Sequence, residues 1–192
     1  MYNVDGLHND DGDQTGAKMI QETGVLKFDD PEDEGAYHEI GHYLAARRFG
    51  WDFDVLEITI VPRVFAAGGS AGHIWLRFNQ GRFSELPYPE AAAYSWAGIA
   101  AQAWWRIRGD EQKWYEQLLE LHGRAFFDLE ILATHPEHRL GVVHEAYMRR
   151  AMDILREERG LMQVLANQLF QLKTLTDLQI LDITNDFCEA TR

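Results

Sequence analysis

Apolar residues recur along most of this chain every three or four positions, which is the period of an amphipathic helix. The first helix is predicted to begin at Pro31, with Asp30 as its N-cap, and to end at Phe49 before Gly50. Acidic residues in its first turn stabilise the helix by interacting with the positive end of its dipole. The remaining predicted helices span 90–108, 111–122, 124–134 and 138–173, with a break near Gly160, and a last short helix follows a capping box that starts at Thr176.

Two short segments have the composition of strands instead. Residues 55–61 are rich in β-branched side chains and are followed by Pro62, and residues 73–78 follow a glycine-rich link at 67–72. Together they predict a small antiparallel sheet. The expected fold class is therefore mainly α with a small antiparallel β-sheet, formed by one domain at residues 31–192.

Acidic residues are concentrated near the start of the chain. Residues 1–34 carry ten Asp and Glu and two Lys, which accounts for −8 of the formal net charge of −13. Residues 1–30 show no apolar period and are predicted to form a flexible acidic arm. A net charge of this sign argues against nucleic acid and against an anionic membrane surface as partners, since both require a basic patch. The expected partner is a protein, a peptide or a metal ion.

Several other features limit the possible classes of protein. The uncharged run at 91–105 is too short to span a membrane and is predicted to be a buried core helix. Nothing after Met1 resembles a secretory signal, so we expect a cytoplasmic location. The one cysteine, Cys188, excludes an internal disulfide framework and a metal site built from cysteines alone.

The first helix contains a complete H-E-x-x-H motif, from His38 to His42. Two histidines four residues apart lie on one helical face and can bind a single Zn²⁺. Glu39, one residue after His38, can act as the general base for a water held by the metal. The alternative, in which both histidines are ordinary helix residues with hydrogen-bond partners, is less favoured because the motif is complete and lies inside a capped helix.

A catalytic zinc site requires a third protein ligand. The extended motif that supplies a third histidine is excluded because Ala45 and Arg48 occupy its key positions. Glu57 lies in a predicted strand and fits poorly as the helical glutamate of a thermolysin-like site. The residues alone leave the third ligand open.

The motif and the segments after it resemble the proteolytic domain of FtsH-type ATP-dependent zinc proteases. The matching segments are 36–42, 58–63, 97–101, 125–130, 146–155 and 174–176, within a likeness that spans about residues 33–182. The resemblance implies an FtsH-protease-domain-like fold, zinc as cofactor and hydrolysis of peptide bonds. It also implies that Asp128, in the segment 125–130, is the third zinc ligand.

The chain departs from the family pattern at several positions. Gln102 and Ala103 stand where the family has paired acids, and Phe127 stands where it has an asparagine before the ligand. Any support of the site by those carboxylates is therefore absent or replaced. The chain has no counterpart of the family's ATPase module or membrane anchors, so we expect an unstructured polypeptide as substrate. The oligomeric state stays open, with a homo-oligomer as one possibility because the family forms rings.

Other candidate residues have both structural and functional interpretations. His122 and Glu130 are candidates for orienting the ligands, whereas a structural role is expected of the other histidines. The strand at 55–61 is either an edge that binds substrate or an ordinary internal strand. Four tryptophans are expected in the core, with a protein interface as the alternative: Trp96, Trp104, Trp105 and Trp114.

These observations predict a stand-alone zinc metalloendopeptidase in which His38, His42 and Asp128 hold Zn²⁺ and Glu39 is the catalytic base. The main alternative is a zinc-binding regulatory or scaffold protein that uses the protease fold to bind a protein partner. A third hypothesis, a compact peptidase that cuts a transcriptional repressor, is less favoured because the matches after residue 55 point to the FtsH-type family.

Overall fold

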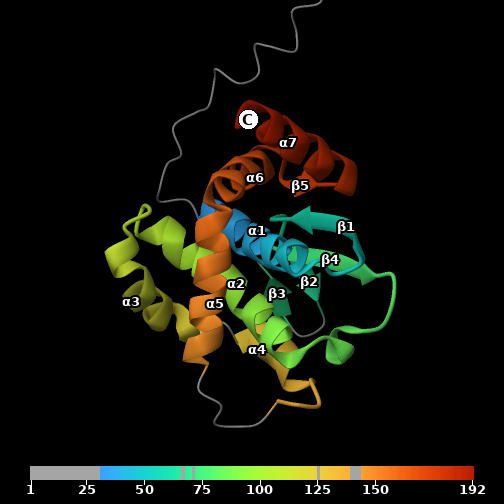
Figure 1. Ribbon diagram of the computed structural model, residues 1–192, viewed down its shortest axis with the longest axis vertical. Helices are drawn as coiled ribbons and strands as arrows, with labels where there is room; N and C mark the ends of the chain where they lie inside the picture. Colours follow the sequence, from blue (N-terminus) through green and yellow to red (C-terminus); the bar gives the residue numbers. More distant parts are fainter. Residues whose placement is uncertain (1–30, 66–67, 71, 125, 139–143) are drawn as a thin grey trace, which may run out of the picture.

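The computed structural model describes residues 31–65, 68–70, 72–124, 126–138 and 144–192, so the acidic arm predicted at residues 1–30 lies outside the described residues. Seven α-helices and a small antiparallel sheet form the described part, which confirms the expected class (Figure 1). The helices are α1 (Pro31–Phe49), α2 (Tyr88–Arg106), α3 (Glu111–Leu121), α4 (Phe126–Ala133), α5 (Glu145–Glu157), α6 (Arg159–Leu172) and α7 (Asp177–Ala190). Two short 3-10 helices, Phe83–Glu85 and His122–Arg124, precede α2 and α4.

The sheet has the strand order β4-β1-β5 and lies beside α1. It consists of β1 (Phe53–Thr59), β4 (His73–Phe78) and β5 (Thr174–Leu175), all paired antiparallel, and a separate hairpin joins β2 (Arg63–Phe65) to β3 (Gly68–Ser70). The central strand is β1, so the edge interpretation of residues 55–61 was wrong and the internal interpretation is correct. Among the described strands, β4 pairs with β1 alone and is an edge.

Helix α1 ends where the sequence predicts it, and the reason is a backbone motif. Gly50 adopts the left-handed conformation, with φ of 68°, which is strained for residues with a side chain. Its N–H donates to the carbonyl of Arg47, and the N–H of Trp51 donates to that of Ala46. This pair of hydrogen bonds is a Schellman motif, which satisfies carbonyl groups left open at the end of the helix.

Helix α2 is the centre of the fold, since it packs against α1, α3, α4 and α5. It is buried on most of its circumference, as expected of the uncharged run at 91–105. All four tryptophans lie in the core, and the indole N–H of Trp114 donates to the carbonyl of Ala100 at 2.7 Å. The core interpretation of these tryptophans is therefore confirmed. Among the described helices, none combines the length and the apolar composition that a membrane span requires.

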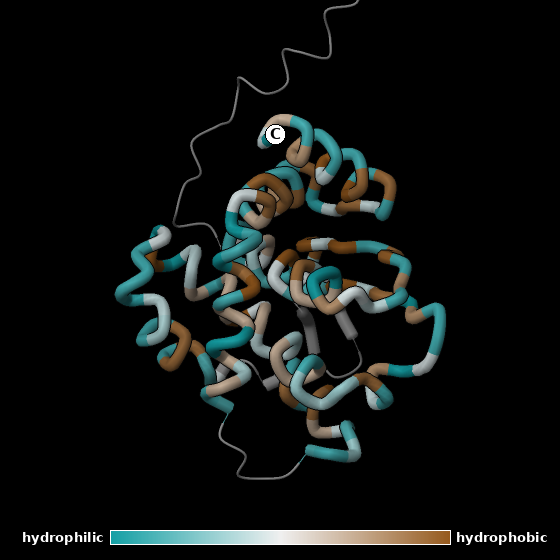
Figure 2. Tube along the Cα trace, in the orientation of Figure 1, coloured by the Kyte–Doolittle hydropathy of each residue, from teal (hydrophilic) through white to brown (hydrophobic). Residues whose placement is uncertain are grey.

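The C-terminal helices follow the predicted pattern, except that the helical stretch predicted from His138 begins only at Glu145 in the described residues. The break between α5 and α6 falls at Glu158, two residues before Gly160. The capping box at Thr176 is present, with the Thr176 hydroxyl accepting from the Gln179 N–H, and it opens α7. Hydrophilic and hydrophobic stretches alternate along the outer helices (Figure 2), because only one face of each is buried against the core.

Candidate metal centre

Helices α1 and α4 bring three potential ligands to one point. The helical period places His38 and His42 on one face of α1, with their Nε2 atoms 3.1 Å apart. Asp128, in the first turn of α4, lies opposite both rings. Its Oδ2 is 3.4 Å from Nε2 of His38, and its Oδ1 is 3.3 Å from Nε2 of His42. Among the described residues, these three form the group of His, Cys, Asp and Glu side chains that could hold a metal ion.

The separations match the requirements of a small tetrahedral cation. Zinc bonds of about 2.0–2.1 Å in a tetrahedral site place ligand atoms about 3.3 Å from each other. The two Nε2 atoms are 3.1 Å apart, and each is 3.3–3.4 Å from an oxygen of Asp128, Oδ2 for His38 and Oδ1 for His42. Three side chains leave a fourth coordination position open, as catalytic sites do. One ligand atom from each side chain lies within 4.8 Å of the others, so the group can hold a metal ion once one oxygen of Asp128 faces both rings.

The orientation of His42 is fixed by the backbone of α2. Its Nδ1 lies 2.9 Å from the carbonyl oxygen of Tyr94. A carbonyl oxygen only accepts, so Nδ1 carries a proton, which leaves Nε2 as the ring nitrogen that can bind a metal. This is the tautomer that binds a metal.

Close approach of α2 to the two histidines depends on Gly98. A Cβ atom at this position would lie 2.8 Å from Nε2 of His38 and closer still to Nε2 of His42. Any side chain at residue 98 would therefore clash with both ligand atoms. Sequence reasoning placed Gly98 in a small-residue helix but missed this role, and its signal is the lone glycine inside an alanine-rich helix.

The carboxylate of Asp128 and the imidazole of His38 hold each other in charged form when no metal is bound. Burial is the largest single influence on His38 and would lower its pKa, but the charge of Asp128, a hydrogen bond to it and the charge of Glu39 together outweigh burial and raise this pKa to about 9. Burial opposes ionisation of Asp128 as well, yet the charges of His42 and His38 hold the pKa of its carboxyl far below the usual range. The site thus favours an anion at Asp128, which is the form that binds a cation.

Glu39 is a buried carboxyl next to this group. Only 6% of its surface is exposed, and burial raises its pKa although the charges of His38 and His42 oppose the shift. Gly72, directly before β4, packs over it, since a Cβ added there would lie 3.2 Å from its Oε1. A raised pKa suits a group that accepts and returns a proton near neutral pH.

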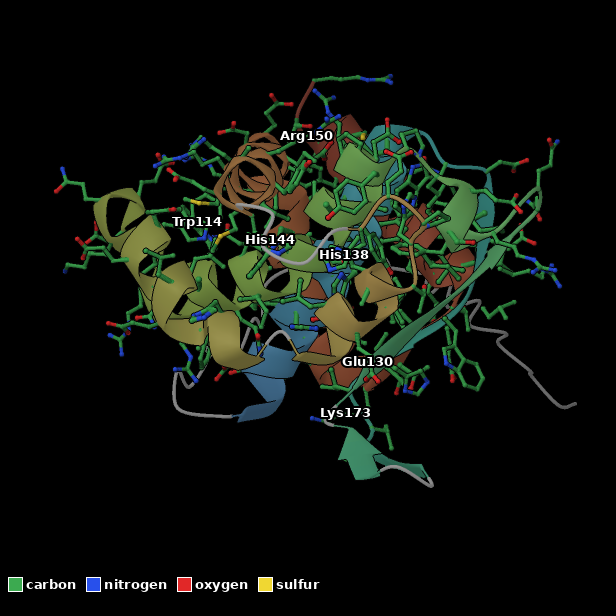
Figure 3. All side chains as sticks on the ribbon, turned by 90° about the horizontal axis from the view of Figure 1, so that it is seen from below. Trp114, Glu130, His138, His144, Arg150 and Lys173 are labelled. Atoms are coloured by element: carbon green, nitrogen blue, oxygen red, sulfur yellow. The ribbon has the colours of Figure 1, made fainter. Side chains whose placement is uncertain are left out.

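The remaining histidines that the structure describes have structural partners, as expected. His73 pairs with Glu57 at 3.0 Å across β4 and β1. His135 and His138 contact the segment before α2 and its first turn, through the Leu86 carbonyl and the Tyr88 hydroxyl. His144 stacks beside His138, with ring centroids 6.2 Å apart (Figure 3).

The two residues predicted as candidates for orienting the ligands are both exposed. Nδ1 of His122 lies 2.8 Å from the Leu119 carbonyl at the end of its own helix, so this ring caps α3. Glu130 lies two residues after Asp128, and residues two apart on a helix do not face each other. The hydrogen-bond partner found for a ligand comes from α2 instead, namely the Tyr94 carbonyl that contacts His42.

Comparison with protein-family models found no match for this chain, and comparison with curated proteins found none. The resemblance to the FtsH-type proteolytic domain therefore stays a prediction. So do the ligand role of Asp128 and the catalytic role of Glu39, whereas the convergence of the three candidate ligands is a property of the structure.

Proposed function

We propose that this protein is a zinc-dependent endopeptidase that hydrolyses unstructured polypeptides. The observation that supports it most directly is the convergence of His38, His42 and Asp128 beside the buried carboxyl of Glu39. Two imidazoles and one carboxylate, with a fourth position open, are a ligand set typical of catalytic zinc. Calcium and magnesium prefer sites made of oxygen ligands, which disfavours them here.

In the proposed reaction, the cofactor and Glu39 have different roles. A bound zinc ion supplies a Lewis acid that lowers the pKa of water and polarises the scissile carbonyl. The Glu39 carboxylate accepts the proton of the attacking water and returns it to the departing amine nitrogen. The buried position of Glu39 keeps its proton affinity high enough for both steps, because burial disfavours the charged form.

The edge strand β4 supports an extended polypeptide as the substrate. β4 starts directly after Gly72, which packs on Glu39, and in the view of Figure 1 it lies between β1 and α4. Its backbone groups on the side away from β1 can pair with a substrate segment that adds as a further strand. A folded domain cannot present such a segment, so flexible peptides and unstructured tails are the proposed substrates.

The decisive experiment replaces Glu39 by glutamine, which keeps the shape of the side chain but cannot accept the proton. Zinc content is measured by elemental analysis, and cleavage by the appearance of new termini in casein or a diverse peptide library. We expect Glu39→Gln to keep zinc and to lose at least about 10²-fold in cleavage rate. Glu130→Gln, an exposed change on α4, is the matched control and should cleave like the wild type.

Equal cleavage by Glu39→Gln and the wild type would contradict the mechanism. Zinc binding without cleavage of any peptide by the wild type would favour the alternative, a zinc-binding scaffold protein. That alternative has less support, because the four tryptophans that could have formed an interface lie in the core.

A further inference from the structure

Two rows of residues face each other where α1 packs on α2. On α1 the row is Glu34, His38 and His42, each four residues after the one before it. On α2 the row is Tyr94, Gly98, Gln102 and Arg106, with the same spacing. Spacing by four keeps each row on one face of its helix. One end of the rows lies at the metal centre, and the other end contains an ordered set of polar groups.

Glu34 and Arg106 form a two-pronged ion pair at that end. The Arg106 Nε donates to Oε1 of Glu34 at 3.0 Å, and Nη2 donates to Oε2 at 2.9 Å. Such bidentate pairs hold both side chains in a fixed geometry. Glu34 is only partly exposed, so the pair is shielded from water on one side.

This ion pair determines which way the amide of Gln102 points. The Gln102 Nε2 donates to Oε1 of Glu34 at 3.4 Å. An ionised carboxylate only accepts hydrogen bonds, so the amide nitrogen must face Glu34. The amide oxygen, Oε1, is therefore turned away from Glu34.

Two buried polar atoms between these helices then lack a hydrogen bond of normal geometry in the described part of the chain. They are Oε1 of Gln102 and Nδ1 of His38. The two atoms are complementary, because Oε1 accepts and Nδ1 must donate when Nε2 of the same ring faces a metal. The side chains are neighbours in the facing rows, because Gly98, one turn before Gln102, lies against the ring of His38, and Glu34, one turn before His38, contacts Gln102.

We propose that Gln102 is the positioning residue of His38: its Oε1 accepts the Nδ1–H hydrogen bond and thereby fixes the ring and tautomer that bind the metal. The inference rests on the proposed metal centre. The two histidines are then oriented by different means, His42 by the Tyr94 carbonyl and His38 by an amide held in place by Glu34 and Arg106. At this position the resemblance leads one to expect an acid, and the amide replaces it with a neutral acceptor.

The test measures zinc affinity of the full chain by competition with a chromophoric chelator. Gln102→Met keeps the length of the side chain and removes the strong acceptor, so we expect about 10–100-fold weaker zinc binding. Gln102→Glu restores an acceptor and should restore most of the affinity. Gln117→Met on α3, whose amide bonds only to Glu120 among the described partners, is the matched control and should bind like the wild type.

A spectroscopic measurement separates positioning from a general loss of structure. In the zinc-loaded wild type, the Nδ1–H proton of His38 should be visible by NMR and protected from exchange with water. The same proton should exchange rapidly in Gln102→Met, while that of His42 stays protected. The wild-type measurement still decides if Gln102→Met does not fold, since a rapidly exchanging proton on His38 there would overturn the proposal.

The possible failures are distinguishable. Wild-type zinc binding together with unchanged affinity in Gln102→Met would overturn the role of Gln102 and leave the metal centre intact. A wild-type protein that takes up no zinc would contradict the metal centre itself.

Discussion

Replacing Gly98 by alanine should disrupt the metal centre through a single methyl group. The added Cβ would lie 2.8 Å from Nε2 of His38 and nearer still to Nε2 of His42. An ordinary contact is about 3.5 Å, so the ring of His38 must move by roughly 0.7 Å relative to α2, and the ring of His42 by more. Metal–ligand distances tolerate only about 0.2 Å. We therefore expect Gly98→Ala to weaken zinc binding by more than the roughly 100-fold that loss of an orienting partner costs.

The same substitution gives a prediction for stability with a defined sign. Alanine has the higher helix propensity, by about 1 kcal/mol, so propensity alone would make Gly98→Ala stabilising. Overpacking of a close helix contact costs about 1–3 kcal/mol, which exceeds that gain. We expect the metal-free variant to unfold at lower denaturant concentration than the metal-free wild type.

The assay compares Gly98→Ala with Gly123→Ala. A Cβ at Gly123 would meet nothing within 4 Å, so this control should match the wild type in zinc affinity and stability. Zinc affinity is measured by chelator competition and stability by urea unfolding followed by circular dichroism. A Gly98→Ala variant that binds one zinc ion with wild-type affinity would refute the reasoning, because the two Nε2 atoms could then not be the ligands.

Three further outcomes follow from other parts of the structure. Removing zinc with a chelator should lower the melting temperature by roughly 5–10 °C relative to protein in zinc at 100 times its Kd, because zinc binding at that concentration adds about 2.7 kcal/mol to the free energy of unfolding. An unchanged melting temperature on calorimetry would speak against a bound ion. Trp114→Phe removes the indole donor to the buried Ala100 carbonyl and should cost about 1–3 kcal/mol by urea unfolding, with zinc affinity retained. Burial, with the neighbouring charge of His138, lowers the pKa of His144 below 6.5. The unfolded state therefore accepts a proton more readily than the folded state, and the free energy of unfolding should fall as the pH drops through about 6.5. Urea midpoints at pH 7.5 and 5.5 should differ less in His144→Gln than in the wild type.

The local features of the fold could be predicted from the sequence because their causes are local. α1 starts at a proline and ends at Gly50, and both signals lie within a few residues of the helix ends. β4 has the predicted bounds, and the capping box at Thr176 opens α7 as expected. β1 begins two residues earlier than predicted, and its register with β4 shifts between Val55 and Glu57, an irregularity that alternation along one strand cannot indicate.

Features that depend on distant partners were not predictable in the same way. The two-residue strand β5 exists because Leu175 and Thr174 pair with Ile58 and Thr59, and nothing in so short a segment indicates a strand. The position of Asp128 came from a resemblance between families, because helical spacing within α1 says nothing about α4. The orientation of Gln102 depends on Glu34, which lies on another helix.

The metal centre and the packing of α1 on α2 depend on the same narrow contact. Beside Gly98, a Cβ at Gly41 would clash with the Ala97 carbonyl and lie 2.8 Å from Cβ of Ala101. Small residues thus let the two helices approach closely enough for α2 to supply the Tyr94 carbonyl to His42. Enlarging a residue in this contact should therefore reduce stability and metal affinity together, whereas changing a ligand should reduce metal affinity and leave the helix contact in place. The ratio of the two effects separates residues that bring the helices together from residues that bind the ion.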